Sequence, residues 1–215
     1  EKIPFIIHPH GGPNARDYWG YNPEVQFYAT RGYGVIQMDY RGSTGYGRKE
    51  MILANHQMGK KMQEDKYDAL MWANDQGYVD MDSVCISGAS YGGYAAMQAA
   101  TKNPELFKCI IAYVGVYDLT SMDLRGLQWS ELGMPMEYIE KGDPRDPDDY
   151  KNLYENSPLF FAENVEDPIL IITGRRDTQV RFQETVDMVN ELKKYNKAVS
   201  CTHLTLPTRS YVYIS

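Results

Sequence analysis

Short apolar runs alternate with amphipathic stretches along this chain. Strands are predicted at residues 3–8, 34–39, 84–86, 108–115, 169–172 and 199–206. Helices are predicted at residues 24–30, 60–76, 182–195 and, from small residues, between Gly92 and Pro104. The helix at 60–76 should bury Met62, Tyr67, Leu70, Met71 and Ala73. Because strands alternate with helices, we predict a parallel, doubly wound sheet.

Residues 118–154 follow neither pattern and are rich in glycine, proline and acidic residues. This stretch is either a surface excursion or a lid that walls a binding site, and the sequence leaves both open. No repeat, low-complexity tract or linker divides the chain. Its 215 residues suit one large α/β domain or two small ones.

The stretch from Val84 to Ala96 carries the clearest chemical signal. An apolar run leads into Gly88-Ala89-Ser90-Tyr91-Gly92, and small residues follow. Strand, sharp turn and helix in this order are the context of a nucleophile elbow. Gly88 and Gly92 would let the strand and the helix approach each other, and Ser90 should have a strained, positive φ. Its hydroxyl would then stand at the positive end of the following helix.

Three loops should meet at the carboxyl edge of the predicted sheet. They hold Gly12 after the first strand, Ser90 after the elbow strand, and Asp177 after the strand at 169–172. A serine hydrolase needs a nucleophile, a base, a carboxylate that orients the base, and two N–H donors for the oxyanion. Ser90 precedes Asp177, as in α/β-hydrolases. The backbone N–H groups of Gly12 and Tyr91 are the predicted donors.

Composition narrows the range of partners. The net charge is −7, and no run of Lys and Arg exceeds two residues, so we expect no nucleic acid partner. No apolar stretch has the length of a membrane span, so no membrane partner is expected. Three cysteines are too few and too scattered for a disulfide framework or a zinc site. Cys85 and Cys109 are therefore expected to be small buried thiols.

Four motifs together carry a family resemblance. They occur in the order His10-Gly11-Gly12-Pro13, Asp39-Tyr40-Arg41-Gly42-Ser43-Thr44-Gly45-Tyr46-Gly47, Gly88-Ala89-Ser90-Tyr91-Gly92-Gly93-Tyr94 and Ser157-Pro158. From about residue 4 to 189, the chain resembles the hydrolase domain of the prolyl oligopeptidase family, which includes acylaminoacyl peptidases and dipeptidyl peptidases. The resemblance implies an α/β-hydrolase fold: a mostly parallel, doubly wound sheet with helices on both faces.

The resemblance also implies roles for individual residues. The run from Gly174 to Val180 matches the acid loop of the family, so Asp177 takes the role of the triad aspartate. Trp129 and Val180 fall where the family builds the pocket for the substrate side chain. Gln179 falls where dipeptidyl peptidases place an amide that holds a substrate carbonyl. We expect no cofactor and no metal, and a short peptide or small ester as substrate; homo-oligomerisation stays open.

The chain departs from the family pattern at both ends. A Pro-x-x-Gly-His turn should carry the catalytic base, but here the sequence reads Leu206-Pro207-Thr208-Arg209-Ser210-Tyr211, with Tyr211 nearest the histidine position. The closing helix, the first strands of the sheet and the family's β-propeller are also missing. The resemblance therefore implies that residues 1–215 are a single hydrolase domain truncated at both ends.

The other histidines have structural interpretations. His203 lies within the last predicted strand, where packing is a better expectation than service as the base. His8 and His10 should brace the oxyanion loop, and His56 should lie on the surface. Arg41 should tie its glycine-rich loop to a carboxylate.

Three hypotheses remain. The first is a serine peptidase that acts through Ser90 and is impaired by the missing histidine. The second is a carboxylesterase, because an ester needs less protonation of its leaving group than an amide. The third is a non-catalytic remnant of the fold.

Overall fold

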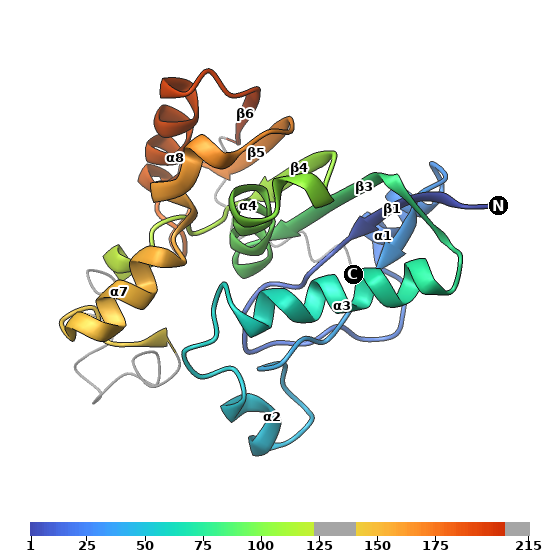
Figure 1. Cartoon of the computed structure of the whole chain (residues 1–215), viewed down its shortest axis with the longest axis horizontal. Helices are drawn as coiled ribbons and strands as arrows, with labels where there is room; N and C mark the ends of the chain where they lie inside the picture. The colour runs from blue at the N-terminus through green and yellow to red at the C-terminus, as the bar shows by residue number, and fades with distance from the viewer. Residues whose placement is uncertain (123–140, 205–215) are drawn as a thin grey trace.

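The computed structural model describes residues 1–122 and 141–204, which form a six-stranded parallel sheet with helices around it (Figure 1). The strands are β1 (Ile3–Ile7), β2 (Gly34–Ile36), β3 (Val79–Ala89), β4 (Cys109–Tyr113), β5 (Ile169–Gly174) and β6 (Val199–Leu204). Their order across the sheet is β2-β1-β3-β4-β5-β6, and every pair of neighbours is parallel. The predicted doubly wound α/β architecture is confirmed.

Helices connect the strands, as the sequence predicts. They are α1 (Pro23–Ala29), α2 (Arg48–Ile52), α3 (Lys61–Asp75), α4 (Tyr91–Lys102), α7 (Pro147–Glu155) and α8 (Phe182–Lys194), with 3₁₀ turns η1 (Pro104–Leu106), η2 (Thr120–Met122) and η4 (Pro158–Asn164). The sequence pattern did not predict α2 or α7. Among the helices of residues 1–122 and 141–204, none is long and apolar enough to cross a membrane.

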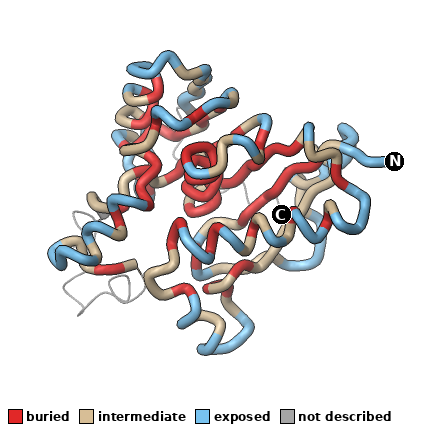
Figure 2. Tube along the Cα trace, in the orientation of Figure 1, coloured by how far each residue is buried: buried red, intermediate tan, exposed pale blue. Residues whose placement is uncertain are grey.

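The main core lies on one face of the sheet. Alternate residues of the strands point to this face, and Ile7, Ile86 and Ile171 on it are fully buried. They pack against α3, α4 and α8, which contribute side chains such as Leu70 and Leu192 to the same core. Figure 2 shows the continuous buried band that β3, α4 and their neighbours form. This packing holds the carboxyl ends of β3, β4 and β5 at one edge of the sheet.

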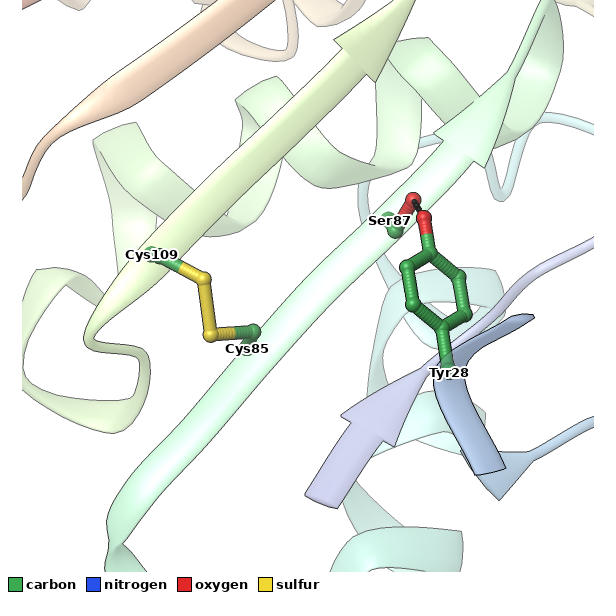
Figure 3. Close-up of a disulfide and its surroundings, with 4 residues drawn as sticks. All are labelled: Tyr28, Cys85, Ser87 and Cys109. Carbon is green, nitrogen blue, oxygen red and sulfur yellow. Dashed lines mark hydrogen bonds between the residues drawn. A yellow bond between two sulfur atoms is a disulfide. The ribbon is translucent and has the colours of Figure 1, made fainter. Parts of the chain in front are cut away.

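The opposite face carries α1 and a disulfide. The Tyr28 hydroxyl of α1 lies 2.9 Å from the Ser87 hydroxyl, and Ser87 alternates with the core residues of β3 (Figure 3). Helices therefore cover both faces, as predicted. Cys85 lies on the same side as Ser87 and is bonded to Cys109. The expectation of two free thiols is wrong: strands β3 and β4 pair Cys85 directly with Cys109, with their Cα atoms 4.7 Å apart.

Candidate active site

Ser90 lies at a sharp turn between β3 and α4. Its φ of 55° and ψ of −116° confirm the predicted strained conformation. The turn is tightly enclosed, because a Cβ on Gly88 would lie 2.8 Å from the backbone of Gly92, and one on Gly92 would collide with the carbonyl oxygen of Pro9. The Ser90 N–H donates to the Tyr113 carbonyl of β4 at 2.9 Å. The elbow geometry that presents a serine hydroxyl above a sheet is thus present.

The loop after β1 packs directly against this elbow. A Cβ added to Gly11 would lie 3.4 Å from the Ser90 Cβ and 3.1 Å from the Ala89 carbonyl oxygen. The next residue, Gly12, is exposed, whereas Tyr91, which follows Ser90, is only 3% exposed. The two predicted oxyanion donors, Gly12 and Tyr91, therefore belong to two segments that pack against each other at the elbow.

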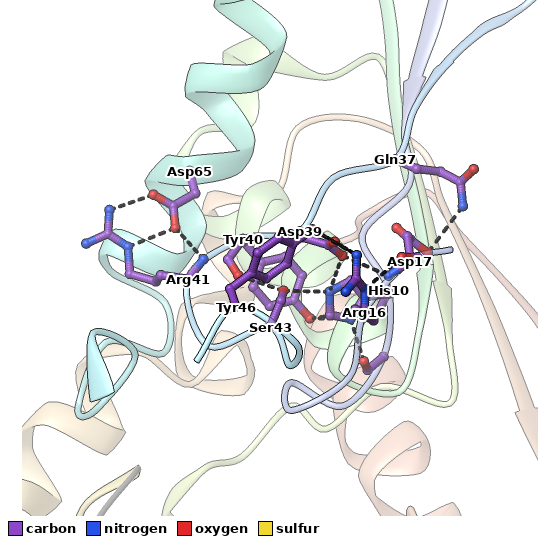
Figure 4. Close-up of polar contacts among 11 residues, drawn as sticks. His10, Arg16, Asp17, Gln37, Asp39, Tyr40, Arg41, Ser43, Tyr46 and Asp65 are labelled. Carbon is purple, nitrogen blue, oxygen red and sulfur yellow. Dashed lines mark hydrogen bonds and ion pairs between the residues drawn. The ribbon is translucent and has the colours of Figure 1, made fainter. Parts of the chain in front are cut away.

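A polar network holds the Gly11–Gly12 loop in place (Figure 4). His10 Nδ1 lies 2.7 Å from the Gly11 carbonyl oxygen, and His10 Nε2 lies 2.9 Å from the Ser43 hydroxyl. The Tyr40 ring stacks on the imidazole with the centroids 4.3 Å apart, and its hydroxyl donates to the His10 carbonyl at 2.8 Å. Asp39 approaches His10 Nε2 at 3.7 Å. His10 thus braces the Gly11–Gly12 loop, as predicted.

The glycine-rich loop at 40–47 is fixed by a second set of contacts. Arg41 donates to both carboxylate oxygens of Asp65 in α3, at 2.8 and 2.6 Å, and its backbone N–H donates to the same carboxylate at 3.0 Å (Figure 4). Burial alone would raise the pKa of Asp65, but these hydrogen bonds outweigh it and hold the pKa below its usual value. Arg41 thus ties its loop to a carboxylate, as predicted.

Asp177 lies in the loop after β5. Strand β4 separates β5 from β3, so the Asp177 loop and the elbow share the carboxyl edge of the sheet. The Asp177 carboxylate accepts hydrogen bonds from the N–H groups of Gln179 and Val180, at 2.7 and 3.0 Å. Tyr113, at the end of β4, lies between the two loops. Burial raises the pKa of its phenol, and the negative charge of Asp177 raises it further.

The predicted substrate residues are only partly described. Gln179 is exposed, and Val180, the last residue of the acid loop, is only 5% exposed. Trp129 lies outside the described residues, and so does the sequence from Leu206 to Tyr211. The structure therefore places Gln179 and Val180 beside Asp177.

Each histidine has a partner other than Ser90 or Asp177. His8 was predicted to brace the loop after β1, but its Nδ1 lies 2.9 Å from the Ser87 carbonyl oxygen of β3. His203 Nε2 lies 3.1 Å from the Cys201 sulfur, and its ring packs edge-on against Phe182. His56, predicted on the surface, is partly exposed, and its Nδ1 lies 3.2 Å from Asp149 of α7, a contact between segments far apart in sequence. Within the described part of the chain, no histidine contacts Ser90 or Asp177.

Two residues near the carboxyl ends of the strands, Glu184 and Val114, could not be identified from the sequence. Glu184 at the start of α8 is 4% exposed and accepts the N–H groups of Tyr117 and Asp118, at 3.1 and 3.2 Å. It therefore fixes the loop after β4 beside the acid loop, although its position in the sequence resembles an ordinary helix surface. Val114 has a φ of 44°, which is rare for a β-branched residue. Val114 lies in the loop after β4 and Glu184 binds this loop, which follows the strand between β3 and β5.

The chain is similar to known peptidases over nearly its whole length. Residues 19–206 match the sequence pattern of the prolyl oligopeptidase family. The chain is 36% identical over 208 residues to dipeptidyl peptidase family member 6 of Caenorhabditis elegans. It is 35% identical over 212 residues to dipeptidyl aminopeptidase BIII of Pseudoxanthomonas mexicana. These matches cover 96% and 97% of this chain but only 28% and 30% of the relatives, so the chain spans less than a third of their length.

Solved structures show the same fold. An acylaminoacyl peptidase in complex with Z-Gly-Gly-Phe-chloromethyl ketone superposes with a TM-score of 0.84 at 27% identity, over 96% of this chain and 33% of that one. A puromycin-hydrolyzing peptidase of Mycobacterium tuberculosis gives a TM-score of 0.80 at 28% identity, over 94% of this chain and 30% of that one. The matched residues, the sequence identity and the shared fold show that the chain belongs to the prolyl oligopeptidase family, a family of serine peptidases.

Proposed function

We propose that this chain is the hydrolase domain of a serine peptidase that cleaves short peptides by acyl transfer through Ser90. The observation that carries the proposal is the strained Ser90 elbow, with the Gly11–Gly12 loop packed against it and the Asp177 loop at the same edge of the sheet. This is the arrangement that nucleophilic catalysis by serine requires.

In the proposed reaction, Ser90 Oγ attacks the substrate carbonyl carbon while its proton passes to a base. The N–H groups of Tyr91 and Gly12 stabilise the oxyanion. The base returns the proton to the leaving amine as the C–N bond breaks, and water then releases the acyl group by the same steps in reverse. Asp177 orients the base. One imidazole bridging Ser90 Oγ and the Asp177 carboxylate implies a separation of about 6–8 Å between them.

The sequence has no histidine at the position where the catalytic base is expected. Family resemblance expects a histidine where the sequence has Tyr211, and the four histidines of the chain have the partners described above. We therefore propose that the chain with this sequence turns over slowly, because a serine hydroxyl is a weak nucleophile without a base. The residual rate would come from the oxyanion hole and from substrate binding.

The relatives suggest the class of substrate. Dipeptidyl peptidases and acylaminoacyl peptidases, by their names, remove short units from peptides. Val180, with Trp129, would wall the pocket for the substrate side chain, and Gln179 would hold a substrate carbonyl. The alternative is a carboxylesterase. The missing histidine favours it, because ester cleavage depends less on protonation of the leaving group.

A fluorophosphonate probe tests the proposal. The probe should form an adduct on Ser90, located by peptide mass spectrometry, and Ser90→Ala should abolish it. Residual triad activity of about 10³–10⁴-fold over water predicts slow hydrolysis of an activated ester and almost none of an amide. His203→Ala should change neither rate, since we assign that residue a packing role. If Ser90 stays unlabelled and neither substrate is cleaved, the chain is a non-catalytic remnant and the proposal fails.

A further inference from the structure

A lysine is buried beneath the candidate site. Lys66 of α3 is 0% exposed, and its ammonium group donates to the Met62 carbonyl of its own helix at 2.6 Å. Lysine is almost never buried completely without a paired carboxylate. The adjacent Asp65 forms its bidentate pair with Arg41, and within the described residues no ion pair reaches Lys66. In the part of the chain that the structure describes, the Lys66 amine therefore lies in the interior without a carboxylate partner.

Aromatic rings take the place of a carboxylate. The Lys66 ammonium lies 3.9 Å from the centroid of the Tyr40 ring and 5.3 Å from that of Tyr91. His10 stacks on Tyr40 at 4.3 Å. At these distances the ammonium and the imidazole cannot share one face of the ring, so Tyr40 lies between them. One continuous stack thus runs from Lys66 through Tyr40 to His10, whose Nδ1 lies 2.7 Å from the Gly11 carbonyl oxygen.

The second ring leads to the other oxyanion donor. Tyr91 follows Ser90 directly, and its backbone N–H is the second predicted donor. Its side chain is 3% exposed, and its hydroxyl has no hydrogen-bond partner in the described part of the chain. The Tyr91 ring is therefore held by packing, between Tyr40 at 5.3 Å and Tyr94 at 5.5 Å, with the Lys66 ammonium over it. Lys66 therefore contacts both rings: that of Tyr40, which stacks on His10 beside the Gly11–Gly12 loop, and that of Tyr91, whose N–H is the second predicted donor.

We propose that Lys66 is a positioning residue for the oxyanion hole, and that its positive charge stabilises the negative charge that develops beside Ser90. The inference rests on the proposed function, because it assumes that an oxyanion forms there. A cation inside the protein acts over a longer range than one in water, since the surrounding dielectric constant is low. The charge strengthens the site without touching the substrate.

The charge should depend on pH. Burial lowers the pKa of Lys66 to about 7, and the neighbouring Asp65 of α3 opposes this shift only in part. The other groups that face Lys66 stay neutral, because burial raises the pKa of Tyr40 in the glycine-rich loop and of Tyr91 in α4. The ammonium is therefore present below about pH 7 and is lost above it. The oxyanion hole should lose this support as the pH rises.

The test compares rates of probe labelling for the full chain and for Lys66→Met, a variant of similar side-chain length without charge. The ratio of the two rates cancels every pH effect that the proteins share. We expect the unchanged chain to label about tenfold faster at pH 6, less than the roughly 10²–10³-fold cost of losing a direct oxyanion donor. The ratio should fall toward one above pH 8. Unfolding temperature and circular dichroism check that the variant folds, as expected for an apolar replacement of a buried charge.

A second measurement does not depend on labelling rates. NMR of ¹⁵N-lysine-labelled protein should show the Lys66 signal titrating near pH 7. It should titrate at higher pH once the phosphonate adduct on Ser90 has lost its alkoxy group and carries a negative charge. A labelling ratio that stays constant with pH, or a Lys66 signal that ignores the adduct, would overturn this inference alone. Failure of every chain to label at Ser90 would overturn the proposed function and this inference with it.

Discussion

The two sides of the candidate site are built in different ways. The nucleophile side, which comprises the Gly11–Gly12 loop and the Ser90 elbow, is held from behind by His10, Tyr40 and Ser43. On the acid side, the hydrogen bonds of the Asp177 carboxylate stay within its own loop, because it accepts the N–H groups of residues two and three positions further along. The difference suggests that the nucleophile side is rigid and that the acid side tolerates change.

The largest loss of stability should come from adding a side chain at Gly92, where the elbow packs against the loop after β1. Gly92→Ala would place a methyl group against the Pro9 carbonyl oxygen, where only backbone could move away. Overpacking of this kind costs roughly 1–3 kcal/mol and more where the backbone is fixed. We expect a large loss of unfolding free energy and no labelling of Ser90. Gly20→Ala is the comparison: nothing lies within 4 Å of its added Cβ, so its cost comes from the positive φ of 159° alone and should be smaller. A stable, labelled Gly92→Ala chain would contradict the close packing of the elbow.

Lys66→Met should change how stability depends on pH. The pKa of Lys66 is about 7 in the folded chain, below the unfolded value near 10.4, so the folded state releases the proton first. Stability of the unchanged chain should therefore gain up to about 1.4 kcal/mol per pH unit from this group between about pH 7 and 10. The variant should lack this gain and should be the more stable protein at pH 6. Urea unfolding at several pH values measures the difference, and parallel curves would contradict it.

Removing the Asp65 carboxylate should loosen the support of the glycine-rich loop. Asp65→Asn breaks a bidentate pair with Arg41, for which we expect a loss of about 1–3 kcal/mol. Because its hydrogen bonds lower the pKa of Asp65, the contribution is present above the usual carboxyl pKa and is lost as the pH falls below it. Asp68→Asn, exposed on the same helix, is the control. Equal stability of the two variants would show that the pair carries little energy.

The smallest change in stability should occur on the acid side. Asp177→Asn keeps an oxygen that can accept the N–H groups of Gln179 and Val180, so we expect a loss below about 1 kcal/mol. Thermal unfolding of this variant beside Asp65→Asn measures the contrast between the two sides. A larger loss for Asp177→Asn would reverse the comparison.

Features that depend on a short stretch of sequence could be predicted. The strands, the main helices and the Ser90 elbow follow from apolar periodicity and from glycines whose spacing is set by close packing. The helix α7 was missed because its start signal, Asp146 before Pro147, lies in a stretch without apolar periodicity. The elements that were predicted are those whose signal lies within a few neighbouring residues.

Contacts between distant segments were not readable in this way. In α3 the pattern predicted Met71 as buried, but it is 36% exposed, whereas Lys66 and Gln63 are buried. The polar run around Lys66 resembles a solvated helix face, and only the fold brings Tyr40 and Tyr91 over its ammonium. The Cys85–Cys109 disulfide was missed for the same reason, because it depends on which strands are neighbours.

Ser90 and Asp177 are proposed to act through one imidazole. The double variant Ser210→Gly/Tyr211→His restores the Pro-x-x-Gly-His pattern after Leu206, and Ser210→Gly/Tyr211→Phe is its matched control. We expect the histidine variant to label at Ser90 faster than the control by about 10³-fold or more, and Asp177→Asn in that background to remove most of the gain. Equal labelling of the two variants, or a gain that survives Asp177→Asn, would contradict the claim.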